Sequence, residues 1–432
     1  GSTLTLGGSG TAVTLASGST QTGFGRTGAV DWQTSIKTST ITVVNGEGYF
    51  VNTTGGAITA NLPAGSAGAI VSFRDYANTF DSNSLTVSPN GSEKINGLAI
   101  DLIVSTEGES LTLVYADATK GWLIVNDGNN DAGSQVEYVA ATGGTITTVC
   151  TNFKVHTFTG PGTFTVTNAG NAAGSNTVDY MVVAGGGGGG SDGGGGAGGG
   201  YRESSGANSG GYTRSPLGAC VSALSVPATA YPITVGGGGP GAPTSGNGTN
   251  GSNSIFSTIT SAGGGRGGDK STPCKAGANG GSGGGASRDA GGSGGAGSGN
   301  TPPVSPPQGN NGGAQPATSA ADGAGGGGAG AVGSNGGSPG TDGGGPGAVG
   351  TPSDISSSTV VRAGGGGGGT DSVNTPGGGG TGGSGGGGPG GKRCVAGGAG
   401  SANLGGGGGS GGTGAAGGQG GSGVVIIRYK FQ

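Results

Sequence analysis

Residues 180–190 read Tyr-Met-Val-Val-Ala-Gly-Gly-Gly-Gly-Gly-Gly, an apolar segment of β type that runs directly into glycine. The same junction recurs as Tyr-Pro-Ile-Thr-Val-Gly-Gly-Gly-Gly at residues 231–239, and in reverse as Gly-Ser-Gly-Val-Val-Ile-Ile-Arg-Tyr at residues 421–429. An apolar segment such as the last would be prone to aggregation unless it paired as a strand. The pattern therefore predicts a β shell whose strands are joined by long glycine excursions.

Glycine accounts for 120 of the 432 residues, and most of it lies after residue 180. Runs such as residues 185–190 and 405–409 break the regular glycine spacing of collagen, which excludes a collagen triple helix. A flexible low-complexity linker is the ordinary interpretation of such composition, because glycine loses the most backbone entropy on ordering. The apolar segments at the ends of the glycine runs argue against that linker.

Polyproline II geometry suits the glycine runs, since it has about three residues per turn and no internal hydrogen bonds. Several such helices packed side by side can hydrogen-bond through their backbones if no Cβ keeps them apart, and only glycine permits that approach. A run of six glycines would span roughly 19 Å. We therefore predict a lattice of polyglycine II helices, held by backbone hydrogen bonds in place of a hydrophobic core.

The part before the glycine runs has a different composition. Residues 1–28 alternate small and apolar residues but hold too few bulky side chains for a core, so we predict the end of an intertwined, trimeric β shaft. Residues 29–131 contain strand-like segments, turn signals and both tryptophans, and predict a compact β domain. Residues 132–150 are predicted to be a polar connection, and residues 151–432 the glycine-rich domain. The predicted fold is all-β with essentially no α-helix.

Charge and composition exclude several classes of function. Charged residues make up 9% of the chain and the net charge is −4, so we expect no nucleic-acid partner and no basic surface for anionic lipid. No apolar stretch is long enough for a transmembrane helix, so no membrane insertion is expected. One histidine and four cysteines leave little for a metal centre or a histidine-based catalytic set. We therefore expect no metal, no cofactor and no enzymatic activity.

Two glycine-containing motifs are better explained by chance. Gly386 to Lys392 approximates a phosphate-binding loop, but Arg393 stands where Ser or Thr must bind Mg²⁺. Gly264 to Asp269 matches the start of a calcium-binding nonapeptide that does not continue. His156 lies in a strand-like run without a ligand at metal-binding spacing, which indicates a structural histidine.

Three phrases carry a resemblance to a known family: Gly-Ala-Val-Asp-Trp-Gln-Thr (28–34), Gly-Glu-Gly-Tyr-Phe-Val-Asn-Thr-Thr (46–54) and Thr-Leu-Val-Tyr-Ala-Asp-Ala-Thr-Lys-Gly-Trp (112–122). They resemble the distal β domain of tail-fibre proteins from marine tailed bacteriophages. The strand–glycine junctions quoted above are similar to the glycine-rich domain that often follows it. In design rather than in motif, the glycine runs also resemble the polyglycine II tip adhesins of T-even-like phages.

The resemblance implies a homotrimeric fibre tip, located in the tail fibre of the virion and assembled with other tail or fibre proteins. Its expected partner is a bacterial surface receptor, either protein or polysaccharide, and its expected activity is binding rather than catalysis. A glycine-rich structural or extracellular filament is one alternative, although the regular repeat that it would need is missing from residues 1–180. A glycan-hydrolysing fibre tip is the other, and activity on host polysaccharide would reveal it.

Recognition is predicted to come from the segments between the glycine runs, because the runs themselves carry no side chains. Tyrosine and arginine are favoured interface anchors, since they bury much area and also hydrogen-bond. The candidate receptor-binding residues are Tyr201, Arg202, Tyr212, Arg214, Asp269, Lys270, Lys392 and Arg393. The alternative for each of them is a structural role at the edge of the lattice or the β shell.

The cysteines Cys150, Cys220, Cys274 and Cys394 allow about three full pairings. Cys274 and Cys394 each lie in a short segment between glycine runs, where a crosslink would be well placed in a domain without a large core. Such a disulfide would close a loop of about 120 residues and add a few kcal/mol of stability on the chain-entropy model. Free thiols are the alternative, because virions assemble in a reducing cytoplasm.

Overall fold

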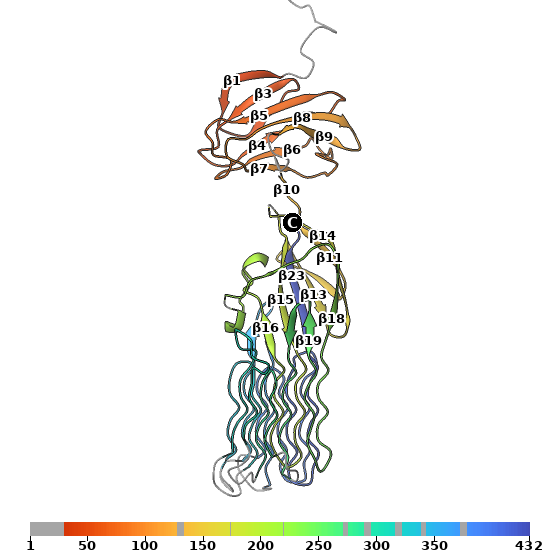
Figure 1. Cartoon of the computed structure of the whole chain (residues 1–432), viewed down its shortest axis with the longest axis vertical. Coiled ribbons are helices and arrows are strands. Elements are labelled where there is room, and N and C mark those ends of the chain that lie inside the picture. The colour runs from red at the N-terminus through yellow and green to blue at the C-terminus, as the bar shows by residue number, and fades with distance from the viewer. Residues whose placement is uncertain are drawn as a thin grey trace, which may run out of the picture. The chain divides into compact units, whose positions relative to one another are not determined.

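The computed structural model describes the chain in stretches, which are residues 30–127, 134–172, 174–218, 220–270, 275–288, 295–315, 322–337, 343–371 and 378–432. The predicted shaft, residues 1–28, lies outside these stretches. The chain divides into two compact units, Gly1–Val136 and Glu137–Gln432 (Figure 1). Helix within the described stretches is confined to the 3-10 helices η1 (Ala207–Ser209) and η2 (Pro216–Gly218), so the predicted all-β fold is confirmed. Neither of these helices is long or apolar enough to cross a membrane.

The first unit packs two five-stranded sheets against each other (Figure 1). The first sheet consists, in spatial order, of β1 (Asp31–Lys37), β3 (Glu47–Val51), β5 (Ile70–Asp75), β8 (Ser110–Asp117) and β9 (Gly121–Asp127). The second sheet consists, in spatial order, of β10 (Ser134–Gln135), β7 (Leu102–Val104), β6 (Leu85–Ser88), β4 (Ile58–Asn61) and β2 (Ile41–Thr42).

The chain alternates between these two sheets from β1 to β6, so sheet neighbours there, such as β3 and β5, run parallel. Apolar and polar residues alternate along the strands as they do in half-buried sheets. In β6, Leu85 and Val87 are buried while Thr86 and Ser88 are half-buried. The buried residues of both sheets form one hydrophobic core that includes Trp122.

The strands of the second unit form a β shell at one end of the glycine runs (Figure 1). One sheet has the order β11 (Val139–Thr142), β14 (Gly162–Ala169), β18 (Ala230–Thr234), β19 (Ser254–Phe256) and β20 (Ile259–Ser261). The other has the order β12 (Thr145–Val149), β13 (Phe153–Phe158), β23 (Val424–Lys430), β15 (Thr177–Val183) and β16 (Tyr201–Glu203), with β17 (Leu224–Ser225) also paired to β15. A two-stranded sheet joins β21 (Thr351–Ser353) to β22 (Val360–Arg362).

The second unit begins earlier in the sequence than predicted. Residues 132–150 were expected to be a polar connection, but they include β11 and β12, which pair with β14 and β13. Val139 and Val149 of these strands are buried in the two cores of the shell, while the threonines between them face outward and give the segment a linker-like composition. The unit boundary therefore lies at Val136 and Glu137 rather than near Thr151.

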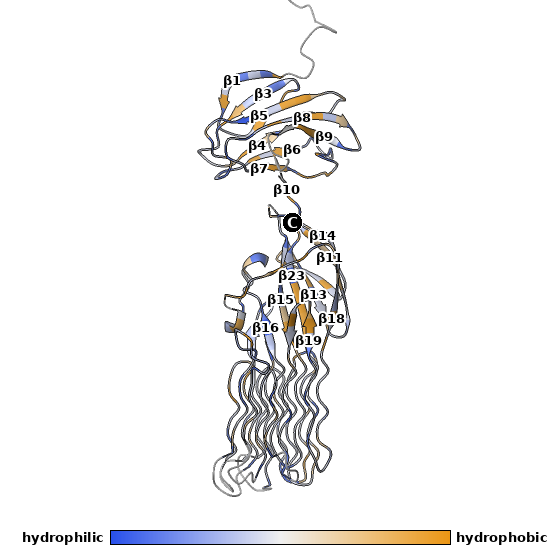
Figure 2. Cartoon of the chain, viewed as in Figure 1, coloured by the Kyte–Doolittle hydropathy of each residue, from blue (hydrophilic) through white to orange (hydrophobic). Residues whose placement is uncertain are grey.

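The terminal apolar segment is a central strand of the shell, as the junction pattern predicted. β23 lies between β13 and β15 and is antiparallel to both. Val425, Ile427 and Tyr429 point into one core, and Val424 and Ile426 point into the other, so the strand is covered on both faces. Figure 2 shows apolar residues concentrated in the strands, while the glycine runs carry almost none.

The glycine runs form the predicted polyglycine II lattice. The run at residues 184–190 donates its N–H groups to three other runs in rotation, and the cycle repeats after three residues. Gly186 donates to Gly421 and Gly189 donates to Gly418, both at 2.9 Å, so residues three apart face the same neighbour. Its carbonyls accept from three further runs, which are residues 235–242, 262–269 and 405–412.

Close packing of these backbones explains the glycine content. A Cβ added to Gly186 would lie 2.1 Å from the carbonyl oxygen of Gly406, and one added to Gly366 would lie 2.1 Å from that of Gly408. Real Cβ atoms do not approach backbone atoms so closely, so an interior run tolerates a side chain at almost none of its positions. Backbone hydrogen bonds replace side-chain packing as the interaction that holds the lattice together.

Candidate functional site: the distal end of the lattice

The runs leave the β shell, turn, and come back to it (Figure 1). Residues 184–190 continue β15, and residues 193–200 lead back to β16, so Ser191 and Asp192 lie at the turn away from the shell. A run of this length spans about 20 Å in polyproline II geometry. We call this side of the unit the distal end and define it by the described residues that gather there, which are Ser191, Asp192, Asp269, Lys270, Arg288, Asp322, Asp371, Lys392, Arg393, Ser410 and Thr413.

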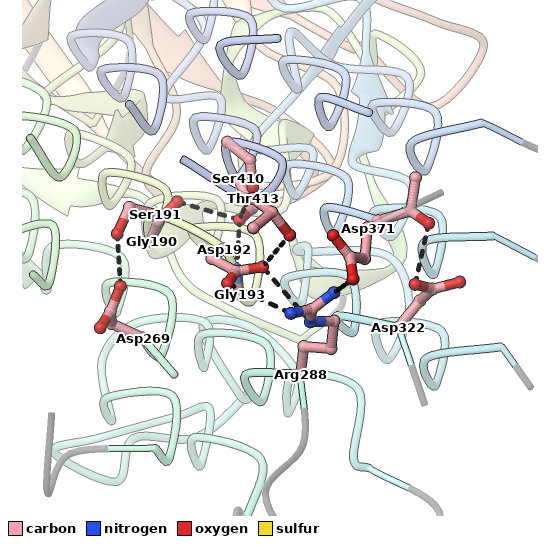
Figure 3. Close-up of polar contacts among 12 residues, drawn as sticks. Gly190, Ser191, Asp192, Gly193, Asp269, Arg288, Asp322, Asp371, Ser410 and Thr413 are labelled. Carbon is pink, nitrogen blue, oxygen red and sulfur yellow. Dashed lines mark hydrogen bonds and ion pairs between the residues drawn. The ribbon is translucent and has the colours of Figure 1, made fainter. Parts of the chain in front are cut away.

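Arg288 is the centre of a polar cluster at the distal end (Figure 3). Its side chain is 6% exposed, and its Nε and Nη2 each lie 3.3 Å from a carboxylate oxygen of Asp192. Its Nη1 lies 2.8 Å from Oδ2 of Asp371. The hydroxyl of Thr413 donates to Oδ1 of Asp192 at 2.9 Å. One guanidinium thus joins segments that follow separate glycine runs.

Hydroxyl groups bind the other carboxylates of the distal end (Figure 3). Ser191 donates to Oδ2 of Asp269 at 2.5 Å, and Thr370 donates to Oδ1 of Asp322 at 2.8 Å. The buried Ser410 hydroxyl donates to a lattice carbonyl and accepts a lattice N–H, both within 3.0 Å. The short polar side chains therefore tie the turns to the ends of the runs.

Burial and hydrogen-bond partners shift the pKa values of two carboxyl groups at the distal end in opposite directions. The Thr413 hydroxyl and the Arg288 guanidinium lower the pKa of Asp371, and the charge of Arg393 acts in the same direction. Burial raises the pKa of Asp322, although the hydrogen bond from Thr370 opposes this shift. Asp371 therefore keeps its negative charge toward Arg288 in mildly acidic solution.

The structure does not bring the predicted receptor-binding residues together in one place, and only some of them lie at the distal end. Lys392 and Arg393 are exposed there, as a recognition role requires. Lys270 is half-buried. Asp269 is fully buried against Ser191, so its prediction as a surface contact is wrong. Its carboxylate holds the end of a run in place.

The predicted tyrosines and their neighbouring arginines lie at the shell instead. They are separated from the distal end by the run at residues 193–200, about 25 Å long in polyproline II geometry. Tyr201 is 1% exposed in β16, so its prediction as a receptor contact is wrong. Tyr212 is half-buried beneath the guanidinium of Arg428, 5.1 Å from the ring centroid, and Arg202 is also half-buried. Only Arg214 of this group is exposed, and it is one of the residues that line a pocket formed by residues 212–216.

Tyr201 is buried because its hydroxyl belongs to a polar cluster around Glu203. The Tyr201 hydroxyl lies 3.0 Å from one Glu203 carboxylate oxygen, which also accepts the N–H of Ser215 at 2.9 Å. Ser353 of β21 donates to the other oxygen at 2.5 Å. Burial raises the pKa of Glu203 despite these donors. The cluster joins β16 to β21, which is a structural role.

The cysteine pairing stays a prediction. Cys394 is an exposed free thiol in the structure, and Cys274 lies outside the described residues. Cys150 and Cys220 are also exposed free thiols. Within the described stretches, no group of three or more histidine, cysteine or carboxylate residues is arranged as a metal site.

Sequence reasoning missed the cluster of Arg288, Asp192, Asp371 and Thr413. A signal was present, since each of these residues lies shortly after the last glycine of a run, and charged or hydroxyl side chains are uncommon within the runs themselves. The position of a residue at the end of a glycine run is therefore a better predictor of a place at the distal end than the type of its side chain. The pairing partners could not be read, because they come from different runs.

A family comparison covers this unit. The family described as "Glycine-rich domain" matches residues 157–430, which include the lattice and most of the shell. No curated protein matches the sequence. Since the family match extends over more than half of the chain, the chain belongs to this glycine-rich domain family.

Proposed function

We propose that the chain is the receptor-binding adhesin at the tip of a bacteriophage tail fibre and that it binds a bacterial surface through the distal end of its lattice. The observation that carries the proposal is the gathering of polar side chains at the distal turns, joined by Arg288, while the runs that lead there carry almost none. A surface built from several turns on one rigid support suits recognition.

The lattice favours binding because it holds the described turns, such as residues 191–192 and 392–394, before any ligand arrives. Both ends of a turn continue into runs that are hydrogen-bonded to several neighbours, so little conformational entropy is lost on binding. The turn sequences can also change without altering the lattice, since its contacts are made by backbone atoms. Lys392 and Arg393 are the exposed cations of the described distal residues, and we assign them to the recognition surface.

The rest of the proposal follows the resemblance of the sequence. The fibre tip is a homotrimer of the virion, joined to other tail or fibre proteins through the predicted shaft at residues 1–28. Its receptor is a protein or polysaccharide of the bacterial outer surface, and its activity is binding rather than catalysis.

A cell-binding assay tests the proposal. Fluorescently labelled chain is mixed with a panel of marine bacterial strains, and a strain that binds it is used to compare two charge-matched double variants. Lys392→Ala with Arg393→Ala should weaken binding by about tenfold or more, as expected for interface anchors. Lys94→Ala with Lys120→Ala removes the same charge from the first unit and should leave binding within about twofold.

Two results would contradict the proposal. Equal weakening by both double variants would indicate a general charge effect instead of a distal site. Binding to none of the strains, with the chain folded, would remove the support for an adhesin.

A further inference from the structure

The perimeter of the lattice is a closed ring of runs. Each of these runs is hydrogen-bonded through its backbone to the next, and the last is bonded to the first. In order around the ring they are residues 235–242, 248–253, 262–269, 276–280, 295–299, 308–315, 331–337, 343–350, 378–384, 386–392, 395–400 and 415–423. A polyglycine II helix at an edge directs about every third N–H away from its own lattice. Such an edge can accept a run of another chain, as the edge strand of a sheet accepts another strand.

Asparagine side chains cover outward N–H groups on one part of the ring. Asn250 accepts the backbone N–H of Arg266, and Asn253 accepts that of Gly263, both at 2.9 Å. The two asparagines are exposed and three residues apart, so they follow the period of the run. The same contact recurs between neighbouring runs further round the ring, where the side-chain oxygens of Asn279, Asn311 and Asn335 accept the backbone N–H groups of Ser298, Gly299 and Ala314 respectively.

Proline removes the outward donor on other runs of the ring. Pro240, Pro346 and Pro389 are exposed, and proline has no N–H to offer. Their carbonyl groups still accept hydrogen bonds within the lattice, at 3.0, 3.2 and 2.8 Å respectively. Each proline therefore keeps its inward bond, while its ring occupies the space that the backbone of a second copy would need.

We propose that these asparagines and prolines close the perimeter against a second copy of this chain, so that the lattice does not grow sideways. Two different chemical devices serve the same end, because asparagine satisfies an outward donor and proline eliminates it. The inference is independent of receptor binding. It separates this chain from a self-assembling glycine-rich filament, which would need open edges.

Glycine and alanine replacements at the prolines test the proposal. Both restore an N–H, but only glycine lets a second backbone come close, because alanine keeps a Cβ. The variant P240G/P346G/P389G should self-associate, with its mass in sedimentation velocity at least doubling over a concentration series. The matched variant P240A/P346A/P389A should keep the mass of the unchanged chain. Glycine and alanine variants that associate equally would overturn the proposal.

A second pair of variants keeps the test decisive if the proline set does not fold. N250G/N253G should associate with rising concentration and should speed amide exchange at Arg266 and Gly263. N250D/N253D retains an acceptor at both positions and should preserve slow exchange there. If every folded glycine variant keeps the mass of the unchanged chain, the perimeter is not closed by these residues and the proposal fails.

Discussion

The few large side chains of the glycine-rich unit have specific structural tasks. Asn250 covers a backbone N–H at the edge of the lattice, and Arg288 joins two carboxylates at its distal end. His156, the one histidine of the chain, lies fully buried in the shell with both ring nitrogens within hydrogen-bonding distance of a partner. Loss of one such side chain leaves a buried partner without its hydrogen bond, which is the costly case for a polar group.

Replacing Arg288 by methionine should destabilise the distal end. The change leaves Asp192 and Asp371 facing each other without their shared cation, and we expect a loss of about 2 kcal/mol. This figure is below the range for a fully buried pair because the side chain of Asp371 is 49% exposed. Hydrogen exchange should accelerate near Ser191 and Asp192, and urea unfolding gives the free energy. Arg214→Met at an exposed position serves as the control and should change neither.

The buried His156 should make stability depend on pH. Burial lowers its pKa, and its ring nitrogens contact the carbonyl of Gly143 at 2.7 Å and the hydroxyl of Tyr429 at 3.0 Å. The folded state therefore favours the neutral ring, whereas the unfolded state takes up a proton near pH 6.5. This contribution to stability is complete above about pH 6.5 and is lost as the pH falls below it.

Urea unfolding between about pH 8 and pH 5 measures this dependence. The variant His156→Gln should unfold more easily at pH 8 and lose the part of the slope that the histidine contributes. The raised pKa of Glu203 acts in the opposite direction, since its neutral form is favoured in the folded state at low pH. The difference between the two proteins isolates the histidine, and equal slopes in both would show that its protonation is not linked to folding.

At the scale of the element, a glycine run differs from a helix or a strand because it has no stabilising partner within itself. Each run depends on neighbouring runs for the backbone hydrogen bonds of its N–H groups, and an interior run has neighbours on all sides. The space for a side chain therefore depends on the position of the run in the lattice. Gly366 faces the backbone of Gly408, whereas Gly237 on the perimeter has no heavy atom near its Cβ position.

Alanine substitutions at these two glycines should have opposite effects. Gly366→Ala places a Cβ 2.1 Å from a carbonyl oxygen, so we expect a loss of about 3 kcal/mol or more in the free energy of unfolding. Gly237→Ala should be neutral or stabilising by about 0.5 kcal/mol, because alanine restricts the unfolded chain. Thermal and urea unfolding compare the two variants. Equal tolerance of both would mean that the runs are not closely packed.

At the scale of the whole molecule, the two units have different sources of stability. The first unit buries one hydrophobic core between two sheets, while the second combines the cores of its shell with a lattice held by backbone hydrogen bonds. Unfolding of the lattice exposes little apolar surface. The cooperativity of lattice unfolding therefore comes mainly from its backbone hydrogen bonds.

Light scattering of the whole chain tests the predicted homotrimer. Residues 1–28 hold too few bulky side chains for a core of their own, so we expect them to associate between copies. The mass in solution should be three times the 39.4 kDa of one chain. A monomer mass at all concentrations would contradict the shaft prediction without affecting the closed perimeter of the lattice.

Local patterns were enough to predict the class of the fold. A run of glycines can form polyglycine II helices because each residue lacks a Cβ, and this is visible from the run itself. The apolar segments at the ends of the runs were equally readable as strands, since β-branched residues such as those of Val424–Lys430 favour pleated, buried positions. The sequence alone therefore determined the all-β shell, the lattice and their order along the chain.

Only the tertiary structure decided which runs are neighbours and which side chains remain exposed. The sequence around Asp269 does not show that the hydroxyl of Ser191, on another segment, hydrogen-bonds its carboxylate. The sequence around Tyr201 does not show that Ser215 and Ser353, from two other segments, complete a buried cluster with Glu203. Arg288 and Asp192 are 96 positions apart in the chain, and nothing local to either predicts their pairing. Glycine runs are nearly identical to one another, so their order in the lattice depends on how the shell strands between them pair and on the turns that join them.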